Sequence, residues 1–534
     1  MRMHRLALIL LGFLLLALAP SVRAQFTFTS DGATVTITGT IWSFAGPVLV
    51  VPPTVSVSGA DLPVTKIGDG AFGYNTNLYS ISLPNGVTTI SSGAFQSCSH
   101  LTNVDIPPSL TTIGESAFWN CYNLGKVDFP AGLTTIGDKA FQSSGLASLL
   151  IPSSVVNFGI NAFESCNSLT NLVLSDGLAA IGDNAFAASS LGTVFIPASV
   201  AVIGDQAFSR SYTLTAINVA PGNPSYTSID GVLFNHSLAS LMLCPAAKSP
   251  TPGRYTVPPG TTTLANAAFY ACNFTNIDLP DGLAAIGYAA FLGTPLTSLK
   301  LPASLRIIYS GVFASSTLTS LTIPEGVTNI GGGAFANCLQ LTNVVLPESL
   351  TSLGGYAFYG SAITTITFPP GLPGIPDGCF LECAKLRAIT NSNRIAVIGG
   401  DAFAQCGRLT AVYFAGNAPS AAAGEFFQGD SATVYYLPGT TGWASTYHGL
   451  NTVPWYLPTP QFVNVTPGFG NRAGQLGITV SWATNLSVAV DATPDLAHPA
   501  WQPLFTNALV NGSFRFFNAF GSAPGGRFYR MRIP

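Results

Sequence analysis

Two aspartates are the residues of this sequence whose type and spacing come closest to a catalytic pair. Asp105 and Asp128 occupy equivalent positions of a recurring segment, 23 residues apart. Hydrolysis of a glycosidic bond uses two facing carboxyl groups, one as the acid and the other as base or nucleophile. The sequence provides neither a cleft nor a proton-relay partner beside them. We therefore expect that this chain is not a glycosidase.

The other candidates for chemistry have simpler structural explanations. Four aspartates follow an Ile-Gly pair and are interpreted as turn residues: Asp69, Asp138, Asp183 and Asp205. The five histidines lack the spacing of metal ligands: His4, His100, His236, His448 and His498. Residues 468–473 match a loose dinucleotide pattern without the βαβ unit it needs, and no G-x-S-x-G, H-E-x-x-H or P-loop motif occurs. We expect no catalytic residue, no metal and no cofactor, hence no enzyme.

A repeat organises the chain. Its signature is Ile-Gly-x-x-Ala-Phe or a close variant, and within each half it returns every 22 or 23 residues. The closing phenylalanines are Phe72, Phe95, Phe118, Phe141, Phe163, Phe186, Phe208, Phe269, Phe291, Phe313, Phe335, Phe358, Phe380 and Phe403. This period is typical of a solenoid, in which each coil buries its apolar face against its neighbours. Such a fold favours binding over catalysis.

Each repeat contains a strand, a turn and the phenylalanine. Leu101–Pro107 alternates apolar and polar residues, which predicts a strand with one buried face, and the proline marks its end. Glycine follows the isoleucine in ten of the fourteen repeats and suits a tight turn or a positive φ. Four repeats have another residue at that position: Ser91, Ala265, Tyr309 and Pro376.

The cysteines follow the same period. Seven of the nine lie three residues after a repeat phenylalanine: Cys98, Cys121, Cys166, Cys272, Cys338, Cys383 and Cys406. Serine, threonine or asparagine takes that place elsewhere, which indicates a small semi-polar interior position. Two pairs lie in adjacent repeats, Cys98 with Cys121 and Cys383 with Cys406, and leave a disulfide open as an alternative. We expect buried free thiols.

These motifs resemble the BspA-like leucine-rich repeat family of surface proteins. Residues 223–234 with 255–258 resemble the longer hairpin-containing unit of that family, and residues 416–455 resemble the unit that closes its arrays. The resemblance implies an extracellular, right-handed repeat solenoid that binds other macromolecules. We expect a mostly β chain with about 15 coils and a cap at each end.

Residues 1–24 have the features of a secretory signal peptide. Arg2, His4 and Arg5 precede an apolar run of fourteen residues, and Val22-Arg23-Ala24 suits cleavage. A membrane anchor, the alternative, needs roughly 20 apolar residues. No later segment is long enough to span a bilayer as a helix. We expect an exported chain, secreted or at the cell surface, with no transmembrane segment after cleavage.

Four further parts are expected. Residues 25–61 form an N-terminal hairpin cap around Asp31-Gly32. Residues 62–414 hold the repeats, with a hairpin-containing insertion at about 218–258, and residues 415–456 close the array. Residues 457–534 lose the repeat after a proline-containing linker and form a small β-sandwich-like module.

The low charge of the chain restricts the classes of molecule that it can bind. Only 8% of the residues are charged and the net charge is −3, whereas an ordinary soluble domain has roughly 25% charged residues. The chain therefore lacks the broad basic field that nucleic acid binding requires. We expect no nucleic acid partner, and binding that depends only weakly on salt.

The outward-facing strand positions form the candidate binding surface. This column contains Ser82, Asp105, Asp128, Leu150, Val173, Phe195, Asn218, Asp278, Lys300, Thr322, Val345, Thr367, Thr390 and Tyr413. Contiguous exposed apolar residues often mark interaction sites. We hypothesise that Leu150, Val173 and Phe195 anchor a partner, with Asp105 and Asp128 at the rim. The simpler alternatives are that such residues merely suit strands, or that the insertion covers them.

The function expected from these observations is that of a secreted, non-enzymatic repeat protein that mediates protein–protein or cell-surface adhesion. Its partner would be an extracellular or cell-surface protein. The first alternative is a polysaccharide-binding or structural envelope-associated protein, which aromatic platforms along one face would favour. Only Phe195 and Tyr413 are aromatic in the outward column. The second alternative makes the C-terminal module a minor enzyme or a sorting signal.

Overall fold

The computed structural model describes residues 26–40, 47–248, 253–391, 395–421, 427–437, 440–455, 461–463, 471–472, 475–481, 487–493, 500–508, 513–519 and 528–532. The expected signal peptide and the linker at 457–460 lie outside these residues, as does most of the loose dinucleotide pattern. The described residues contain strands and turns and no helix. They form a β-solenoid of about 16 turns, as the sequence predicts. The chain divides into two compact units, Met1–Leu296 and Thr297–Pro534.

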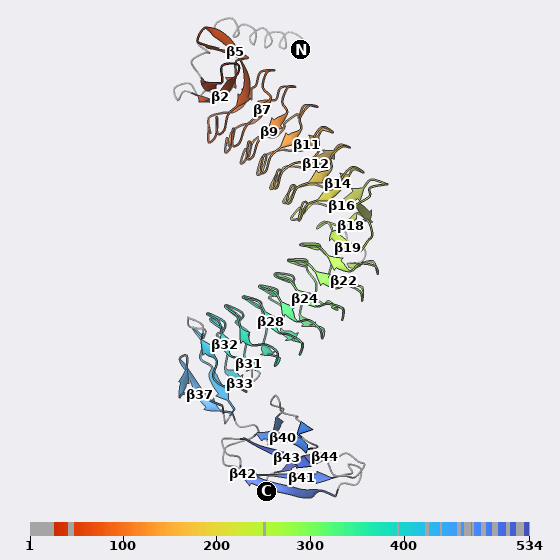
Figure 1. Cartoon of the computed structure of the whole chain (residues 1–534), viewed down its shortest axis with the longest axis vertical. Helices are drawn as coiled ribbons and strands as arrows, with labels where there is room; N and C mark the ends of the chain where they lie inside the picture. The colour runs from red at the N-terminus through yellow and green to blue at the C-terminus, as the bar shows by residue number, and fades with distance from the viewer. Residues whose placement is uncertain are drawn as a thin grey trace. The chain divides into compact units, whose positions relative to one another are not determined.

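In the first unit, most coils have a strand on one face and a shorter strand on another (Figure 1). The first row of strands comprises β3 (Val48–Val50), β6 (Ser80–Ser82), β8 (Asn103–Asp105), β11 (Ser148–Ile151), β12 (Asn171–Leu174), β14 (Thr193–Ile196), β16 (Ala216–Val219), β20 (Arg254–Thr256) and β22 (Asn276–Asp278). The second row comprises β7 (Thr89–Ile90), β9 (Thr112–Ile113), β10 (Thr135–Ile136), β13 (Ala180–Ile181), β15 (Val202–Ile203), β21 (Thr263–Leu264) and β23 (Ala285–Ile286).

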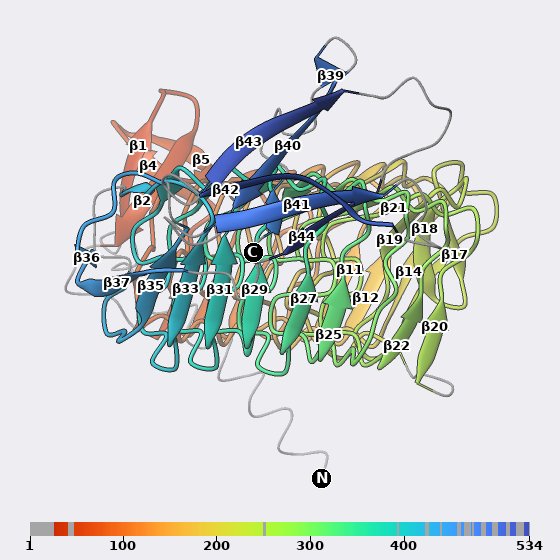
Figure 2. The same cartoon turned by 90° about the horizontal axis from the view of Figure 1, so that it is seen from below.

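The second unit repeats this arrangement, and Figure 2 shows its first row side by side from β25 to β35. That row comprises β25 (Ser320–Thr322), β27 (Asn343–Val345), β29 (Thr365–Thr367), β31 (Ala388–Asn391), β33 (Ala411–Phe414), β35 (Thr433–Tyr436) and β37 (Leu450–Pro454). The second row comprises β24 (Ile307–Ile308), β26 (Asn329–Ile330), β28 (Ser352–Leu353), β30 (Gly374–Ile375), β32 (Val397–Ile398) and β34 (Ser420–Ala421). The hairpin strand β36 (Thr446–Tyr447) pairs with β37.

The repeat phenylalanines form the core of each unit. In the first unit, consecutive rings from Phe72 to Phe208 stack at centroid distances of 4.9–5.6 Å. In the second unit, the rings from Phe313 to Phe403 stack at 5.2–5.5 Å. Phe427 extends this stack by one ring, 5.4 Å from Phe403. The repeat signature did not reveal Phe427, because no Ile-Gly-x-x-Ala precedes it.

The chain on both sides of each phenylalanine has an unusual backbone. The residues two before and two after all fourteen repeat phenylalanines have φ between 52° and 69°. Around Phe141 these residues are Lys139 and Ser143, and the three N–H groups at 139, 141 and 143 donate to carbonyl oxygens of the next coil at 2.8–2.9 Å. A left-handed non-glycine residue costs roughly 1–2 kcal/mol. The ladder of hydrogen bonds to the next coil offsets that cost.

The thiol three residues after the phenylalanine adds a further hydrogen bond to this turn. Cys166 Sγ donates to Phe141 O at 3.2 Å, and Cys121 Sγ donates to Phe95 O at 3.1 Å, so the thiol satisfies a buried carbonyl of the preceding coil. Burial raises the pKa of Cys166 to about 11. All nine cysteines are free and buried. The expectation of buried free thiols is confirmed, and the disulfide alternative is wrong.

At Gly137, which follows the isoleucine of its repeat, two coils approach closely. Gly137 does not have a positive φ, so that part of the expectation is wrong for this position. A Cβ added there would lie 2.6 Å from the Glu115 nitrogen of the preceding coil. The next residue, Asp138, accepts the Ile160 N–H on Oδ1 at 2.8 Å. Asp183 accepts the Asp205 N–H in the same way, which confirms the interpretation of these acids as turn residues.

Hairpins interrupt or precede the coils of the first unit. The hairpin predicted at Asp31-Gly32 is present as β1 (Phe26–Ser30) and β2 (Val35–Thr40). β4 (Thr54–Val57) pairs with β5 (Ala60–Ile67), which begins the second row through its parallel pairing with β7. The insertion contains β17 (Tyr226–Ile229), β18 (Val232–Asn235) and β19 (Ser240–Leu243), joined antiparallel.

Beyond the coils of the second unit, the strands are antiparallel. One set contains β38 (Gln461–Val463), β39 (Asn471–Arg472), β40 (Gln475–Ser481) and β43 (Ser513–Ala519). The other contains β41 (Ser487–Thr493), β42 (Gln502–Ala508) and β44 (Phe528–Arg532). Within the second set, Arg530 forms an ion pair with the buried Asp491 at 3.0 Å. The β-sandwich expected here stays a prediction.

Candidate functional site

The outward strand positions align as the repeat predicts. In the first unit, strand pairing places Val50, Ser82 and Asp105 opposite one another, and Leu150 opposite Val173. Phe195 is in register with Asn218, and its strand β14 lies beside β12. The period-two alternation of each strand therefore converts a 22- or 23-residue repeat into a column of side chains on one face.

Leu150, Val173 and Phe195 are exposed on this face, with exposed fractions of 57%, 46% and 54%. The insertion therefore does not cover them. We call these three residues the apolar stripe. A parallel column of polar side chains flanks it, formed by Ser148, Asn171 and Thr193. Three coils span roughly 10 Å along the axis, which matches a few residues of a partner.

The two acids expected at the rim contact side chains of their own strand segments. Asp105 accepts a hydrogen bond from Asn103 Nδ2 at 2.9 Å, and Asp128 forms an exposed ion pair with Lys126 at 2.8 Å. Neither contact resembles the pairing of a buried catalytic carboxyl group with a proton-relay partner. Among the described residues, no group of three histidines, cysteines or acids could hold a metal ion. The assignment of Asp105 and Asp128 to the rim of a binding surface stays a prediction.

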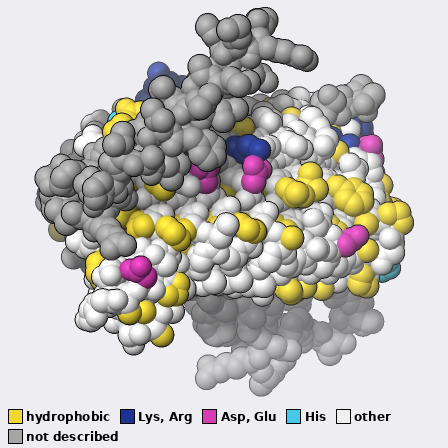
Figure 3. All heavy atoms as spheres, turned by 90° about the horizontal axis from the view of Figure 1, so that it is seen from above, with side chains coloured by type: hydrophobic (Ala, Val, Ile, Leu, Met, Phe, Trp, Pro, Cys, Tyr) yellow, Lys and Arg dark blue, Asp and Glu magenta, His cyan; other side chains and the backbone are white. Residues whose placement is uncertain are grey.

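An ion pair links two neighbouring strands on the outward face of the first unit. Arg254 of β20 and Asp278 of β22 lie on neighbouring strands, and Arg254 Nη2 approaches Asp278 Oδ1 to 2.6 Å. The hydrogen bonds from Arg254 lower the pKa of Asp278. Elsewhere in the sequence charge is sparse, and the view in Figure 3 shows only a few charged side chains among the described residues.

An aromatic cluster in the second unit was missed in the sequence. Tyr413 is in register with Tyr435, and their rings stack at 4.9 Å. Trp455 lies 4.9 Å from Tyr413 at an angle of 53°. All three side chains are partly exposed. Continuing the strand alignment from Tyr413 through residues 433–436 would have found Tyr435, but that strand belongs to a coil without the repeat signature.

The stacked coils, the phenylalanine turn and the exposed strand face together define a leucine-rich repeat solenoid. A family model described as "BspA type Leucine rich repeat region" matches in six copies, over residues 56–169, 134–245, 254–318 and 306–431. The chain belongs to this family. The resemblance stated from the sequence is thereby confirmed.

The chain is similar to solved structures of other bacterial proteins. A leucine rich cell surface protein from Faecalibacterium prausnitzii is 28% identical with a TM-score of 0.58, over 69% of this chain and 93% of that one. The pneumococcal vaccine antigen PcpA is 21% identical with a TM-score of 0.47, over 81% of this chain and 97% of that one. A leucine-rich repeat protein from Bacteroides ovatus is 19% identical with a TM-score of 0.37, over 77% and 93%.

Two further findings bear on function. Among proteins of curated function, none matches this chain. In the described part of the chain, no helix has the length and apolar character needed to cross a bilayer.

Proposed function

We propose that this protein is exported to the cell surface or the medium and binds another protein there, as an adhesin. The observation that carries the proposal is the apolar stripe, which exposes three large apolar side chains on successive coils. Membership of a repeat family with a bacterial cell-surface relative supports it. The sparse charge of the chain suits an interface held by apolar contact rather than by ion pairs.

The binding test uses the purified protein on an array of extracellular matrix proteins and envelope or plant-type polysaccharides. The triple variant Leu150→Ser, Val173→Ser, Phe195→Ser should weaken protein binding at least about tenfold, because apolar anchors carry most of an interface's energy. Its matched control is Val156→Ser, Ile160→Ser, Val202→Ser, which removes residues of similar exposure away from the stripe. Equal affinity of the two triple variants would refute the stripe as the interface.

Salt dependence separates this proposal from charge-driven adhesion. Between about 50 and 300 mM salt, the affinity should change by less than about twofold, because few ion pairs are available to be screened. A steep loss of affinity at high salt would favour Asp105 and Asp128 over the stripe as the determinants.

The alternative is polysaccharide binding, and the cluster of Tyr413, Tyr435 and Trp455 favours it. Partly exposed aromatic rings can pack against sugar rings while adjacent hydroxyls bind their polar edges. Thr390 and Thr433 lie near these rings on the same strand face. Binding to glycans alone on the array, lost in Tyr413→Ala with Tyr435→Ala and kept in the stripe variant, would establish this function in place of the first.

Export and domain organisation belong to the same proposal. We propose cleavage after Ala24, repeats over residues 62–414 with caps at 25–61 and 415–456, and a separate β module at 457–534. N-terminal sequencing of the protein recovered from the medium or the cell surface should begin at Gln25. Recovery of the uncleaved chain in the cytoplasm would contradict export.

A further inference from the structure

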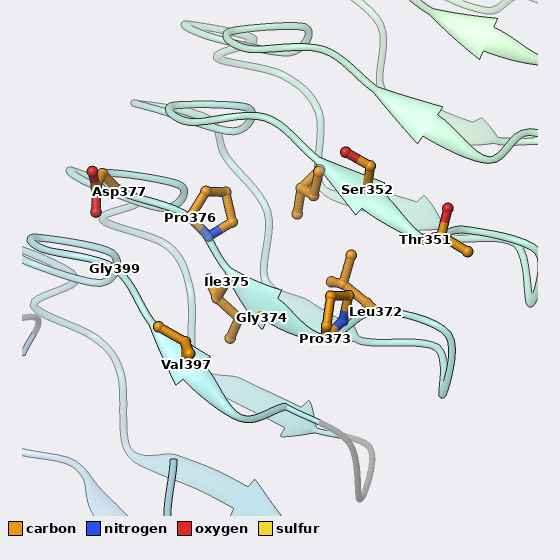
Figure 4. A pocket seen from close by; sticks show the side chains of 11 residues that line it. Thr351, Ser352, Leu372, Pro373, Gly374, Ile375, Pro376, Asp377, Val397 and Gly399 are labelled. Atoms are coloured by element: carbon orange, nitrogen blue, oxygen red, sulfur yellow. The ribbon is translucent and has the colours of Figure 1, made fainter. Parts of the chain in front are cut away.

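The apolar stripe offers a partner more surface than the hollows between coils do. The hollow between β28 and β30 in the second unit has a volume of about 360 Å³ (Figure 4). Two of its apolar walls, Leu372 and Ile375, are only 1% and 2% exposed, so they add almost no contact surface. The three side chains of the stripe are 46–57% exposed. The stripe is therefore the surface on which the chemistry of a partner can be worked out.

The spacing of the stripe decides which kind of chain can lie along it. In the core of the same three coils, the rings of Phe163, Phe186 and Phe208 are 5.4 and 5.6 Å apart. Strands of neighbouring coils lie roughly 4.8 Å apart, so the stripe from Leu150 to Phe195 spans roughly 10 Å. A chain that contacts all three side chains must run along the axis of the solenoid and present an apolar group about every 5 Å.

An α-helix meets this requirement, whereas extended chains do not. On one face of a helix, residues i, i+4 and i+7 span roughly 10.5 Å, because each residue rises about 1.5 Å. In an extended strand, the same-face residues i, i+2 and i+4 span roughly 13 Å. In a polyproline helix, residues of one face recur about every 9 Å, which would skip the middle coil. The stripe therefore matches the anchor pattern of an amphipathic helix.

The positions beside the stripe suit the polar flank of such a helix. Ser148, Asn171 and Thr193 form the neighbouring column, two residues before the stripe on each strand. Asn171 and Thr193 are exposed, and Ser148 is partly exposed. All three side chains donate and accept hydrogen bonds without carrying a charge. A helix that lies on the stripe can therefore keep the polar side chains at its edge hydrogen-bonded.

The charge of this face lies at one end of the stripe. Asp128 occupies the equivalent position one coil before Leu150, and Asp105 lies two coils before it. Both aspartates are exposed. Lys126 pairs with Asp128, but both side chains are largely exposed and water screens the contact. These three charges leave a net negative charge at this end, whereas the column continues at the other end with the uncharged Asn218. This charge distribution is complementary to a helix that is basic at one end.

We propose that the apolar stripe binds an amphipathic α-helix of a partner protein, which lies along the axis of the solenoid. Apolar residues of the helix at i, i+4 and i+7 contact Leu150, Val173 and Phe195. Basic residues at i−3 and i−7 lie over Asp128 and Asp105. The two acids fix the register of the helix more than its affinity, because they are exposed. This inference rests on the proposed function and deepens it, since it names the kind of partner that the same surface binds.

The experiment measures, by fluorescence anisotropy, how tightly the purified protein binds three labelled peptides of about 20 residues. The first is a stapled helix with leucines at i, i+4 and i+7 and arginines at i−3 and i−7. The second has glutamates in place of the arginines. The third has the composition of the first but alternates apolar and polar residues, as a strand does.

The first peptide should bind at least about tenfold tighter than the third, because only its leucines match the spacing of the stripe. It should bind at least about threefold tighter than the second, because its arginines face the two acids. Equal binding of the helix and strand peptides would overturn the proposal. So would equal binding of the arginine and glutamate helices, or the lack of saturable binding by the first peptide.

Variants of the protein locate the helix on the stripe. The triple serine variant of the stripe should weaken binding of the first peptide at least about tenfold, whereas its matched control should leave the affinity unchanged. Asp105→Asn together with Asp128→Asn should abolish the preference for arginine over glutamate, because it removes both charges without changing the shape of the side chains. An unchanged preference in this double variant would overturn the placement of the basic end.

This proposal and the proposed function fail separately. If a protein bound on the array depends on the stripe but the helix peptide does not bind, adhesion through the stripe stands and the helical partner is wrong. If the helix peptide binds the stripe but the triple serine variant keeps its affinity for the proteins on the array, the helix site stands and the proposed adhesion is wrong.

Discussion

The phenylalanine turn and the strand face of the same coils obey different constraints. Every repeat phenylalanine described is flanked by two left-handed residues, whatever residues stand at those positions, and the rings from Phe72 to Phe208 and from Phe313 to Phe403 form regular stacks. The strand face contains a stripe of apolar residues in one unit, an aromatic cluster in the other and several interruptions in its ladders. We infer from this difference that the turn contributes more to the stability of the solenoid than the strand face, which leaves the face free to vary its side chains.

The largest effect is expected from removing one ring of the stack. Phe335→Ala should cost roughly 3–5 kcal/mol, because the side chain is fully buried between Phe313 and Phe358. Thr322→Ala, on the strand face of the same coil, should change the stability by less than about 0.5 kcal/mol. Chemical denaturation of both variants measures the contrast. Comparable losses would show that the face contributes as much stability as the turn.

The next effect concerns the close approach of coils at the Ile-Gly position. Gly137→Ala should destabilise by roughly 1–3 kcal/mol, since its Cβ would lie 2.6 Å from a backbone nitrogen. Gly125→Ala is the matched control, because a Cβ there has no heavy atom within 4 Å and the residue lacks a positive φ. Thermal unfolding of the two variants should separate them clearly. A neutral Gly137→Ala would mean that the coils can move apart without cost.

The smallest effect is a pH dependence in the last coil with a stacked phenylalanine. Asp430 takes the cysteine position there, and neither of its carboxylate oxygens has a hydrogen-bond partner among the described residues. Burial raises the pKa of Asp430 to about 7, from 3.8. The folded state therefore holds the proton more tightly, so stability should fall as the pH rises from about 4 to about 7.

Asp430→Ser, which restores a residue common at this position, should remove that pH dependence and stabilise the chain most at pH 8. The gain should be modest, because the residue as a whole is only partly buried although its two carboxylate oxygens are covered. Denaturation midpoints at pH 5 and pH 8 provide the comparison. A wild-type midpoint that does not fall with pH would contradict the prediction.

Much of the fold was predictable because the period of the repeat fixes which residues are equivalent. The phenylalanine core, the outward column and the semi-polar cysteine position follow from that alignment alone. The left-handed positions could not be predicted, because residues as different as Lys139, Ser143 and Asn161 adopt them. Their conformation is imposed by hydrogen bonds to the next coil and not by residue type.

The candidate site was predictable only in part. The stripe lies on repeats with the full signature, so alignment alone identifies Leu150, Val173 and Phe195 as outward-facing. Tyr435 and Trp455 lie beyond the last signature, so aligning the signatures gives no position for them, although continuing the strand alignment from Tyr413 would have reached Tyr435. The sequence also shows Pro373 and Pro376, but not that β28 (Ser352–Leu353) and β30 (Gly374–Ile375) are left unpaired there.

The hydrogen bonds of the turn also have a consequence for how such a chain is inherited. The Phe95 N–H donates to Ala117 O and the Phe118 N–H donates to Ala140 O, so each coil supplies donors toward the next coil and acceptors toward the previous one. A copy of any coil can therefore follow that coil with every bond satisfied. Duplication or loss of a gene segment that encodes one period preserves the pattern of hydrogen bonds between coils, and the number of coils can change in a single genetic event.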